Sequence, residues 1–280
     1  MTVKIDTDSV ADLPPKVAEE LGISVVPLLI RFGEEVYRDG IEMSNDEFYR
    51  RLKNSQELPV TSVPPPTAFA ETYDKLADDT DQILAIMLTS KLSGTYDVAL
   101  QGIELMKRKC LVEVIDSQWA TMAQGFIVMS AARAANAGAT INELKALVQR
   151  DITRVDMRAV FDTLEFLRRG GRIGRAQAFL GSTLKIKPAI TLREGVVVPA
   201  GKVRTKAKVI DYLHAFAKSY SQIDEIAVED TASTEEADLL VESLGSIFPK
   251  ERIYRSGMTP VIGTHTGPGL LLVAIMGDKR

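Results

Sequence analysis

The 280-residue sequence has few of the side chains from which most metal and redox centres are built. Cysteine occurs once, as Cys110, and histidine twice, as His214 and His265. A single cysteine forms no internal disulfide, and so few ligands argue against a His/Cys metal site. We therefore expect a reduced, cytoplasmic protein that uses no metal or other cofactor.

Several motifs of nucleotide-binding and hydrolytic proteins are also absent. The chain has no glycine triplet at dinucleotide-binding spacing and no phosphate loop ending in Gly-Lys-Ser/Thr. It also lacks the Gly-x-Ser-x-Gly turn that carries the nucleophile of many hydrolases. The sequence therefore gives no indication of a bound nucleotide, and the absences reduce the number of enzymatic functions to consider.

Long apolar runs and an excess of basic charge are lacking as well. The longest apolar runs, such as 270–276, are far below the roughly 20 residues of a membrane helix. Acidic residues near the N-terminus argue against a signal peptide. With 34 basic and 38 acidic residues the formal charge is −4, which argues against a nucleic-acid-binding surface. We expect no membrane span and no nucleic-acid partner.

Apolar segments rich in valine and isoleucine alternate with helical patterns, which is typical of an α/β fold. Pro27 lies inside one of these segments and predicts an edge or a bulge there, because proline cannot donate to a strand ladder. We predict strands at 3–6, 23–30, 83–88, 111–115, 157–161, 188–192, 196–199, 226–229, 252–254 and 270–276.

The helices and turns are marked by local signals. Capping boxes begin at Ser44, Thr140 and Ser233, and Gly138 stands where the alanine-rich helix 120–137 should end. Arg193-Glu194-Gly195 predicts a hairpin turn.

A polar stretch at 149–154 is the best candidate for a domain boundary. We predict two α/β domains, 1–153 and 154–280, and leave open whether the chain crosses between them. The first should be Rossmann-like with a mainly parallel sheet, and the second should have a mixed or partly antiparallel sheet.

Three clusters of hydroxyl groups, each at the edge of an apolar run, are the most informative feature. They are Thr61-Ser62-Val63-Pro64, Ser93-Gly94-Thr95-Tyr96 and His265-Thr266-Gly267-Pro268-Gly269. Hydroxyls, a histidine and glycine-freed N–H groups can hold a small oxyanion without a metal. The third cluster, where we expect a turn to present His265, runs into the apolar segment 270–275. A polar binding site beside apolar surface would suit a fatty acid, which has a carboxylate head and an apolar tail. Ordinary helix caps and loops remain an alternative interpretation of the first two clusters.

Other polar segments allow two interpretations each. The basic, glycine-rich loop 167–175 and the loop around Arg204 could hold a phosphate or a partner's acidic surface, or simply be solvated. Asp8-Ser9 and Asp116-Ser117 each end a predicted strand, where open α/β sheets place ligands. They could equally be turn or cap residues.

Taken together, these motifs resemble the DegV family. The resemblance covers nearly the whole chain, through Asp8-Ser9, Val26-Pro27-Leu28, the three hydroxyl clusters, Ile115-Asp116-Ser117, 164–174 and Ile186-Lys187-Pro188. It implies a bacterial fatty-acid-binding protein with two α/β domains and the ligand in the cleft between them. The best-characterised members carry the acyl chain for a two-part fatty acid kinase, in which an ATP-dependent kinase subunit phosphorylates the bound carboxylate. The resemblance thus implies a long-chain fatty acid and that kinase as partners, and no catalysis by this chain alone.

The resemblance and the residue types together assign a candidate site. Two departures from the family pattern are Pro65, where a serine is usual, and Gly174, where serine is frequent. The ligand carboxylate should be bound by Thr61, Ser62, Ser93, Gly94, His265 and Thr266. Two basic residues should lie near the head group or face the partner, namely Arg172 and Arg204. The tail pocket should be formed by Val25, Val26, Leu28, Ile30, Met122, Phe126 and Phe161.

Two other functions remain open on the sequence. Ser93 could act as the nucleophile of a hydrolase or acyltransferase, with His265 as base and Asp116 orienting it. Such an enzyme requires Ser93 and His265 within hydrogen-bonding reach. Alternatively, the same fold could carry a different amphipathic acid or lipid. Whether the protein carries a fatty acid or another lipid, we expect a monomer that makes at most transient contact with a membrane surface.

Overall fold

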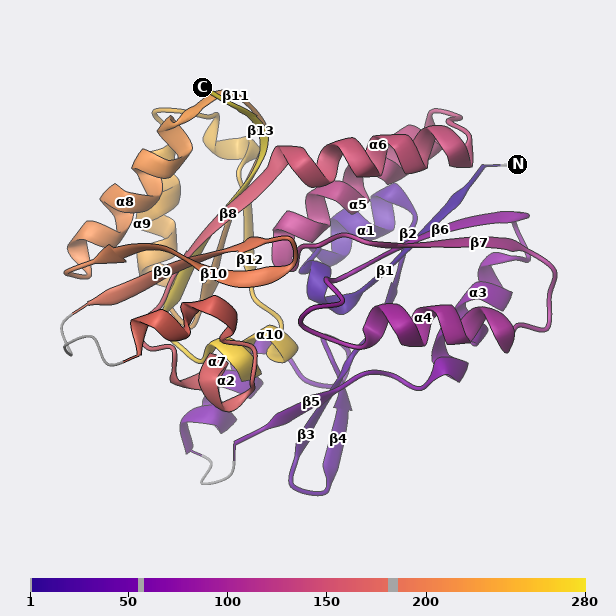
Figure 1. Ribbon diagram of the computed structural model, residues 1–280, viewed down its shortest axis with the longest axis horizontal. Helices are drawn as coiled ribbons and strands as arrows, with labels where there is room; N and C mark the ends of the chain where they lie inside the picture. The colour runs from indigo at the N-terminus through magenta and orange to yellow at the C-terminus, as the bar shows by residue number, and fades with distance from the viewer. Residues whose placement is uncertain (1, 55–57, 181–185) are drawn as a thin grey trace.

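The first sheet is parallel, as the sequence predicts. The computed structural model describes residues 2–54, 58–180 and 186–280 (Figure 1). Its four-stranded parallel sheet has the order β2-β1-β6-β7. The strands are β1 Lys4–Asp8, β2 Ile23–Val26, β6 Gln82–Met87 and β7 Leu111–Asp116.

Helices cover both faces of the parallel sheet, which explains why β6 is apolar along its length. Leu84 and Ile86 point into the core formed with α5, whereas Ile83 and Ala85 point into the core formed with α3 and α4. The helices are α1 Pro15–Leu21, α3 Pro66–Leu76, α4 Thr95–Glu104, α5 Thr121–Asn136 and α6 Ile141–Arg154.

The second large sheet is mixed, in agreement with the prediction for the C-terminal half. Its six strands have the order β10-β9-β8-β13-β11-β12, and only β11 and β12 pair in parallel. The hairpin between β9 and β10 turns at Glu194 and Gly195, both at positive φ, as a two-residue type I′ turn requires. The strands are β8 Val155–Val160, β9 Lys187–Arg193, β10 Val196–Val203, β11 Tyr220–Thr231, β12 Tyr254–Gly257 and β13 Leu270–Lys279.

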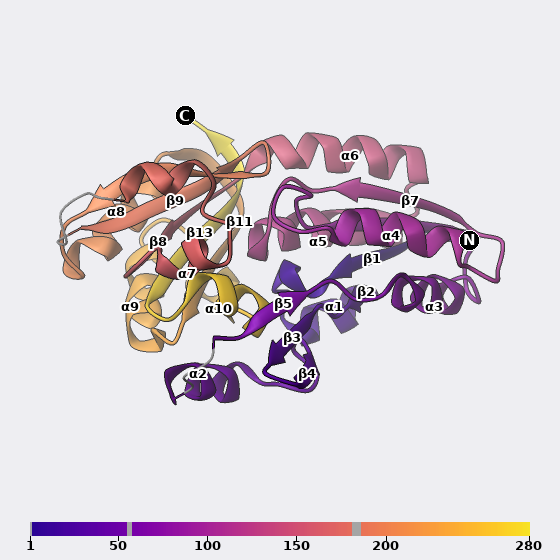
Figure 2. The same ribbon diagram turned by 60° about the horizontal axis from the view of Figure 1, so that its bottom comes forward.

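The two faces of the mixed sheet belong to different cores. On β13, Leu271 and Val273 pack with α8 and α9, while Leu272 and Ala274 face the opposite way, toward α5. Helix α5 contacts β1 of the parallel sheet and β8 and β13 of the mixed sheet, and it is buried on nearly every side. The two sheets therefore share one core across α5 (Figures 1 and 2). The remaining helices are α7 Glu165–Arg169, α8 Ala207–Lys218, α9 Thr234–Leu244, α10 Pro260–Thr266 and the 3₁₀ turns Ser9–Ala11, Gly174–Phe179 and Lys250–Arg252.

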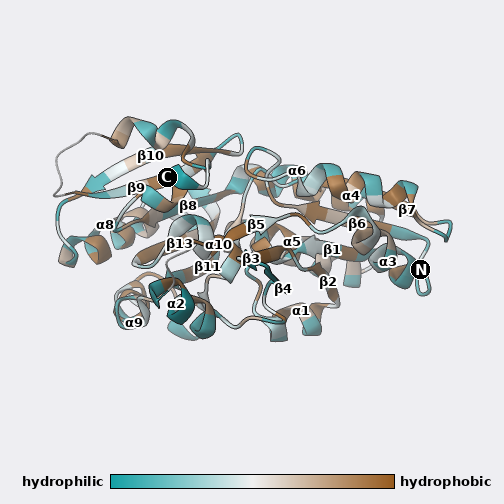
Figure 3. Ribbon diagram, turned by 90° about the horizontal axis from the view of Figure 1, so that it is seen from below, coloured by the Kyte–Doolittle hydropathy of each residue, from teal (hydrophilic) through white to brown (hydrophobic). Residues whose placement is uncertain are grey.

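A small antiparallel sheet, which the sequence did not indicate, projects from the first half. Pro27 ends β2, so the predicted strand 23–30 becomes two strands that belong to different sheets. The small sheet has the order β4-β3-β5, with β3 Leu29–Phe32, β4 Glu35–Arg38 and β5 Val60–Ser62. Helix α2, Asn45–Asn54, follows β4, is mostly hydrophilic (Figure 3) and lies beside α10.

Some local predictions differ from the structure. Residues 250–252 form a 3₁₀ turn, and the strand predicted at 252–254 begins only at Tyr254. The side chain of Ser233 caps no helix, because its backbone N–H is bound by Asp230 and its hydroxyl points back to Thr231. Residue 153, the predicted domain limit, lies in the last turn of α6. Within the described ranges, no helix has the length and apolar character needed to cross a bilayer.

The capping box at Thr140 gives a quantitative test of the local analysis. Its hydroxyl accepts from the N–H of Glu143, and the Glu143 carboxylate accepts from the N–H of Thr140. We expect Thr140→Ala to lower the free energy of unfolding by about 1 kcal/mol, measured by urea denaturation. Ser233→Ala is the matched control and should change stability by less than about 0.5 kcal/mol. Equal losses in the two variants would contradict this assignment.

Candidate ligand-binding site

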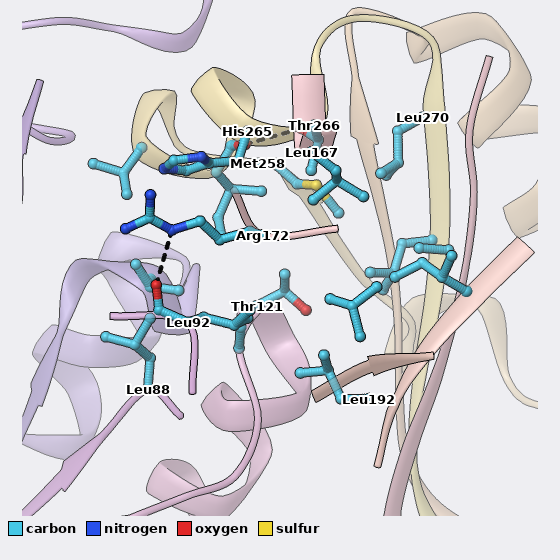
Figure 4. A pocket seen from close by; sticks show the side chains of 18 of the residues that line it. Leu88, Leu92, Thr121, Leu167, Arg172, Leu192, Met258, His265, Thr266 and Leu270 are labelled. Atoms are coloured by element: carbon cyan, nitrogen blue, oxygen red, sulfur yellow. Dashed lines mark hydrogen bonds between the residues drawn. The ribbon is translucent and has the colours of Figure 1, made fainter. Parts of the chain in front are cut away.

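An apolar pocket lies against the mixed sheet, on the face that looks toward α5. Ala159 on β8 is paired with Ile190 on β9 and with Leu272 on β13, so these three side chains lie in one row. Alternate residues of a strand point to the same face. Accordingly Leu192 and Leu270 also line the pocket (Figure 4).

The first half of the chain supplies the opposite wall. Leu28, Leu88 and Leu92 come from segments that follow strands β2 and β6. Ala120 and Thr121 contribute the start of α5, where Thr121 has φ +58°. The pocket therefore lies between the two halves of the chain, and both halves contribute residues to its lining.

One end of the pocket is polar. Thr61, Ser93, Arg172, His265 and Thr266 all line it. The Nε2 atom of His265 lies 2.8 Å from the hydroxyl of Thr61, so a residue of α10 is joined to one of β5. His265 lies in the last turn of α10 and not in a turn outside a helix, which corrects the prediction of a turn. The hydroxyl of Thr266 is directed to the carbonyl of Ile262 in its own helix.

Ser93 reaches the polar end from the loop that precedes α4. Its hydroxyl is 2.8 Å from that of Thr95, and Gly94 is the residue that caps the helix. Gly94 is exposed and does not line the pocket. Ser62 is exposed as well, because neighbouring residues of a strand point to opposite faces and Thr61 points inward. The structure thus brings together Thr61, Ser93, His265 and Thr266, but not Ser62 or Gly94.

Arg172 is held against the backbone beside His265. Its Nε donates to the carbonyl of Leu92 at 3.0 Å and its Nη1 to that of Gly170 at 2.5 Å (Figure 4). Burial and the nearby guanidinium of Arg172 lower the pKa of His265 to about 4. His265 is therefore neutral at pH 7. Arg204, in contrast, is exposed between β10 and α8 and lies outside the pocket.

Two glycines make room for this arrangement. A Cβ on Gly170 would lie 2.3 Å from Nδ1 of His265, so only glycine allows the imidazole to pack there. Gly174 has φ +50°, and a Cβ would lie 2.6 Å from the carbonyl oxygen of Val197. The glycine that departs from the family pattern at 174 thus fits its local backbone.

The geometry does not form the triad of a serine hydrolase. The imidazole of His265 is bonded to Thr61, and its Nδ1 has no hydrogen-bond partner among the described residues. The carboxylate of Asp116 accepts from the backbone N–H groups of Ser90 and Gln118. Asp116 is therefore a turn residue here, which was one of its two sequence interpretations.

Of the seven predicted tail residues, two line the pocket and five lie elsewhere. Leu28 and Phe161 line the pocket. Ile30, Met122 and Phe126 are buried in the shared core without lining it, while Val26 packs on the far face of the parallel sheet. Val25 lines a separate surface groove. Sequence reasoning missed the row on the mixed sheet, namely Met157, Ala159, Ile190, Leu192, Leu270 and Leu272.

These features define the class: an α/β protein with two large sheets and one small one, whose halves enclose an apolar pocket with a polar end. A family model described as "Uncharacterised protein, DegV family" matches residues 2–278. The chain belongs to the DegV family. Protein DegV of Bacillus subtilis is 36% identical over 284 residues, covering 97% of this chain and 98% of that protein. A DegV domain-containing protein of Streptomyces coelicolor is 37% identical, with 98% of each chain covered.

Solved structures of the family match the fold over nearly the whole chain. A DegV family protein from Thermus thermophilus, whose structure is described as showing fatty acid binding, has a TM-score of 0.90 and 32% identity. The structural match covers 99% of this chain and 100% of the Thermus thermophilus chain. DegV from Bacillus subtilis, described as a fatty acid binding protein, has a TM-score of 0.89 and 32% identity at the same coverage. The family resemblance inferred from the sequence motifs is thus confirmed.

The lowered pKa of His265 predicts a pH dependence of stability. The unfolded histidine binds a proton near pH 6.5 and the folded one only near pH 4, so stability is lost as the pH falls through this window. Between pH 7 and pH 4.5 the wild type should lose about 2 kcal/mol more unfolding free energy than His265→Asn. Urea titrations at several pH values measure this difference. Parallel pH profiles for the two proteins would refute a neutral, buried His265.

Proposed function

We propose that this protein binds a long-chain fatty acid, holding its carboxylate at the polar end of the pocket and its tail along the mixed sheet. It then presents the carboxylate to an ATP-dependent kinase subunit. The observation that carries the proposal is the junction of Thr61, Ser93 and His265 with an apolar row of side chains in one pocket. The fatty acid binding described for the relatives from Thermus thermophilus and Bacillus subtilis supports it.

The tail supplies the affinity in this proposal. Burial of a methylene group is worth about 0.8 kcal/mol, so a chain of about sixteen carbons offers on the order of 10 kcal/mol. The row formed by Ala159, Ile190 and Leu272, with Leu28 and Phe161 beside it, provides the apolar surface. A branched or strongly polar ligand would lose contact with this row.

The head group needs donors, because an unpaired carboxylate would cost more to bury than the tail returns. The hydroxyls of Thr61 and Ser93 and the imidazole of His265 are the nearest candidates. All three are neutral, which leaves the carboxylate a better nucleophile than a tight ion pair would.

In the proposed reaction, the kinase transfers a phosphoryl group from ATP to the bound carboxylate. A carboxylate oxygen attacks the γ-phosphorus of ATP, the bond to the β–γ bridging oxygen breaks, and acyl phosphate and ADP are formed. Arg172, already beside His265, would steady the charge on the acyl phosphate. Arg204 is exposed on the loop after β10 and would face the partner. In this proposal the protein works in the cytoplasm as a monomer and exchanges ligand by transient contact with a membrane surface.

Ligand binding is tested by the pair Thr61→Ala and Ser62→Ala. Denatured wild-type protein should release a stoichiometric long-chain fatty acid on solvent extraction, identified by mass spectrometry. Thr61→Ala removes a bond to the charged head and should weaken binding of added fatty acid at least about tenfold, measured by calorimetry. Ser62→Ala changes the neighbouring hydroxyl on the other face and should remain within about twofold.

Other results would redirect the proposal. Extraction of a different amphipathic lipid would retain the carrier role and replace the ligand. Protein that is empty and takes up no added fatty acid would overturn the function. The kinase step is tested separately, by trapping acyl phosphate with hydroxylamine in the presence of ATP and a purified fatty acid kinase subunit; no hydroxamate from loaded protein would exclude presentation to that kinase.

A further inference from the structure

Helix α10, which carries His265, has little to hold it in place by itself. It spans only Pro260–Thr266, and isolated helices of this length are unstable in water. Its first residue is a proline without an N–H group, and the side chain of Thr259 makes no capping hydrogen bond. The position of His265 must therefore depend on contacts that other elements make with α10.

Those contacts include a buried carboxylate at the first turn. The N–H of Val261 donates to Oδ1 of Asp39 at 3.1 Å, and Asp39 is only 2% exposed. The second oxygen of Asp39 is fixed by the hydroxyl of Ser9 at 2.7 Å, which in turn accepts from the N–H of Leu28 at 3.1 Å. A carboxylate at a helix N-terminus also complements the helix dipole.

The small sheet β4-β3-β5 and the residue after β4 contact α10 at both of its ends. Asp39 directly follows β4, and Thr61 lies on β5, while β3 pairs with both strands. Val261 lies in the first turn of α10 and His265 in the last. The bond from the backbone N–H of Val261 to Asp39 and the bond from the His265 side chain to Thr61 therefore hold both ends of α10 against the small sheet and the residue that follows it.

We infer that Asp39 is a positioning residue: by binding the first turn of α10 it sets the imidazole of His265 against Thr61 at the polar end of the pocket. Asp39 does not line that pocket, so it acts through His265. Asp12 gives parallel support, since its carboxylate accepts from the N–H of Thr259 at 3.0 Å. The inference rests on the proposed function for its effect on affinity, but its effect on His265 exists without any ligand.

The test compares Asp39→Ala with Asp39→Asn in the full chain. Asparagine keeps an acceptor for the Val261 N–H, whereas alanine removes it. The first readout is the imidazole ¹⁵N NMR spectrum of ligand-free protein, in which the only other histidine, His214, lies in α8 and serves as internal reference. The second readout is the affinity for a long-chain fatty acid, measured by calorimetry.

The matched control is Asp151→Ala in α6. Asp151 is also a buried carboxylate that accepts from a serine hydroxyl, at 2.6 Å from Ser130. We expect Asp39→Ala to shift the His265 resonances, leave those of His214 in place and weaken fatty-acid binding about tenfold. Asp39→Asn should restore most of both. Asp151→Ala should lower thermal stability without moving His265 or the affinity.

Two outcomes overturn the inference. One is an unchanged His265 spectrum in Asp39→Ala; the other is an equal disturbance of His265 in Asp151→Ala. If Asp39→Ala does not fold, Asp39→Leu takes its place, because leucine fills the buried space and likewise offers no acceptor to the Val261 N–H. A His265 shift in that variant supports the inference and an unshifted spectrum refutes it. Failure of the wild type to bind fatty acid would overturn the proposed function alone, since the NMR result needs no ligand.

Discussion

The burial of α5 between two sheets is the constraint on which the rest of the molecule depends. A helix that is apolar on nearly every side must be covered on every side, and here β1 covers one part and β8 and β13 another. The halves of the chain are consequently held together by a common core and not by a surface contact. The pocket lies where this packing ends, between the start of α5 and the inner face of the mixed sheet.

The polar end of the pocket combines several polar groups with little net charge. Burial and the proximity of Arg172 keep His265 neutral, so the imidazole and the hydroxyl of Thr61 form a neutral pair. Arg172 itself is occupied by two backbone carbonyls, those of Leu92 and Gly170. Its charge acts on the site mainly through the electrostatic field, which falls off more slowly with distance than a hydrogen bond does.

The sequence predicted most of the fold because its signals are local. Alternating apolar runs, the capping box at Thr140 and the turn at Glu194-Gly195 each depend on a few neighbouring residues, and each is present in the structure. β4 and β5 were not predicted from the sequence, because they are short and mostly exposed and have no apolar pattern to mark them. Pro27 signalled an interruption, but not that the chain would leave one sheet for another.

The site was predicted less completely, for a physical reason. Thr61, Ser93 and His265 could be identified from their composition, but which face each neighbour occupies is set by strand register, and this separates Thr61 from Ser62. The tail pocket depends on which sheet face meets α5, a property of the tertiary packing. The apolar segments 157–161, 188–192 and 270–276 carry no alternating pattern that would mark one face, so the apolar row could be identified only once the register between these strands was known.

The alternation of side chains along these strands has a consequence for the substitutions that the pocket lining can accept. Ala159, Ile190 and Leu272 face the pocket, while their chain neighbours Val160, Ala189 and Leu271 belong to the separate core under α8 and α9. Each position on the inner face can therefore vary without disturbing the packing on the outer face. The sheet thus separates the lining of the pocket from the core under α8 and α9, so that a substitution can change the size of the pocket while the layer behind it stays packed.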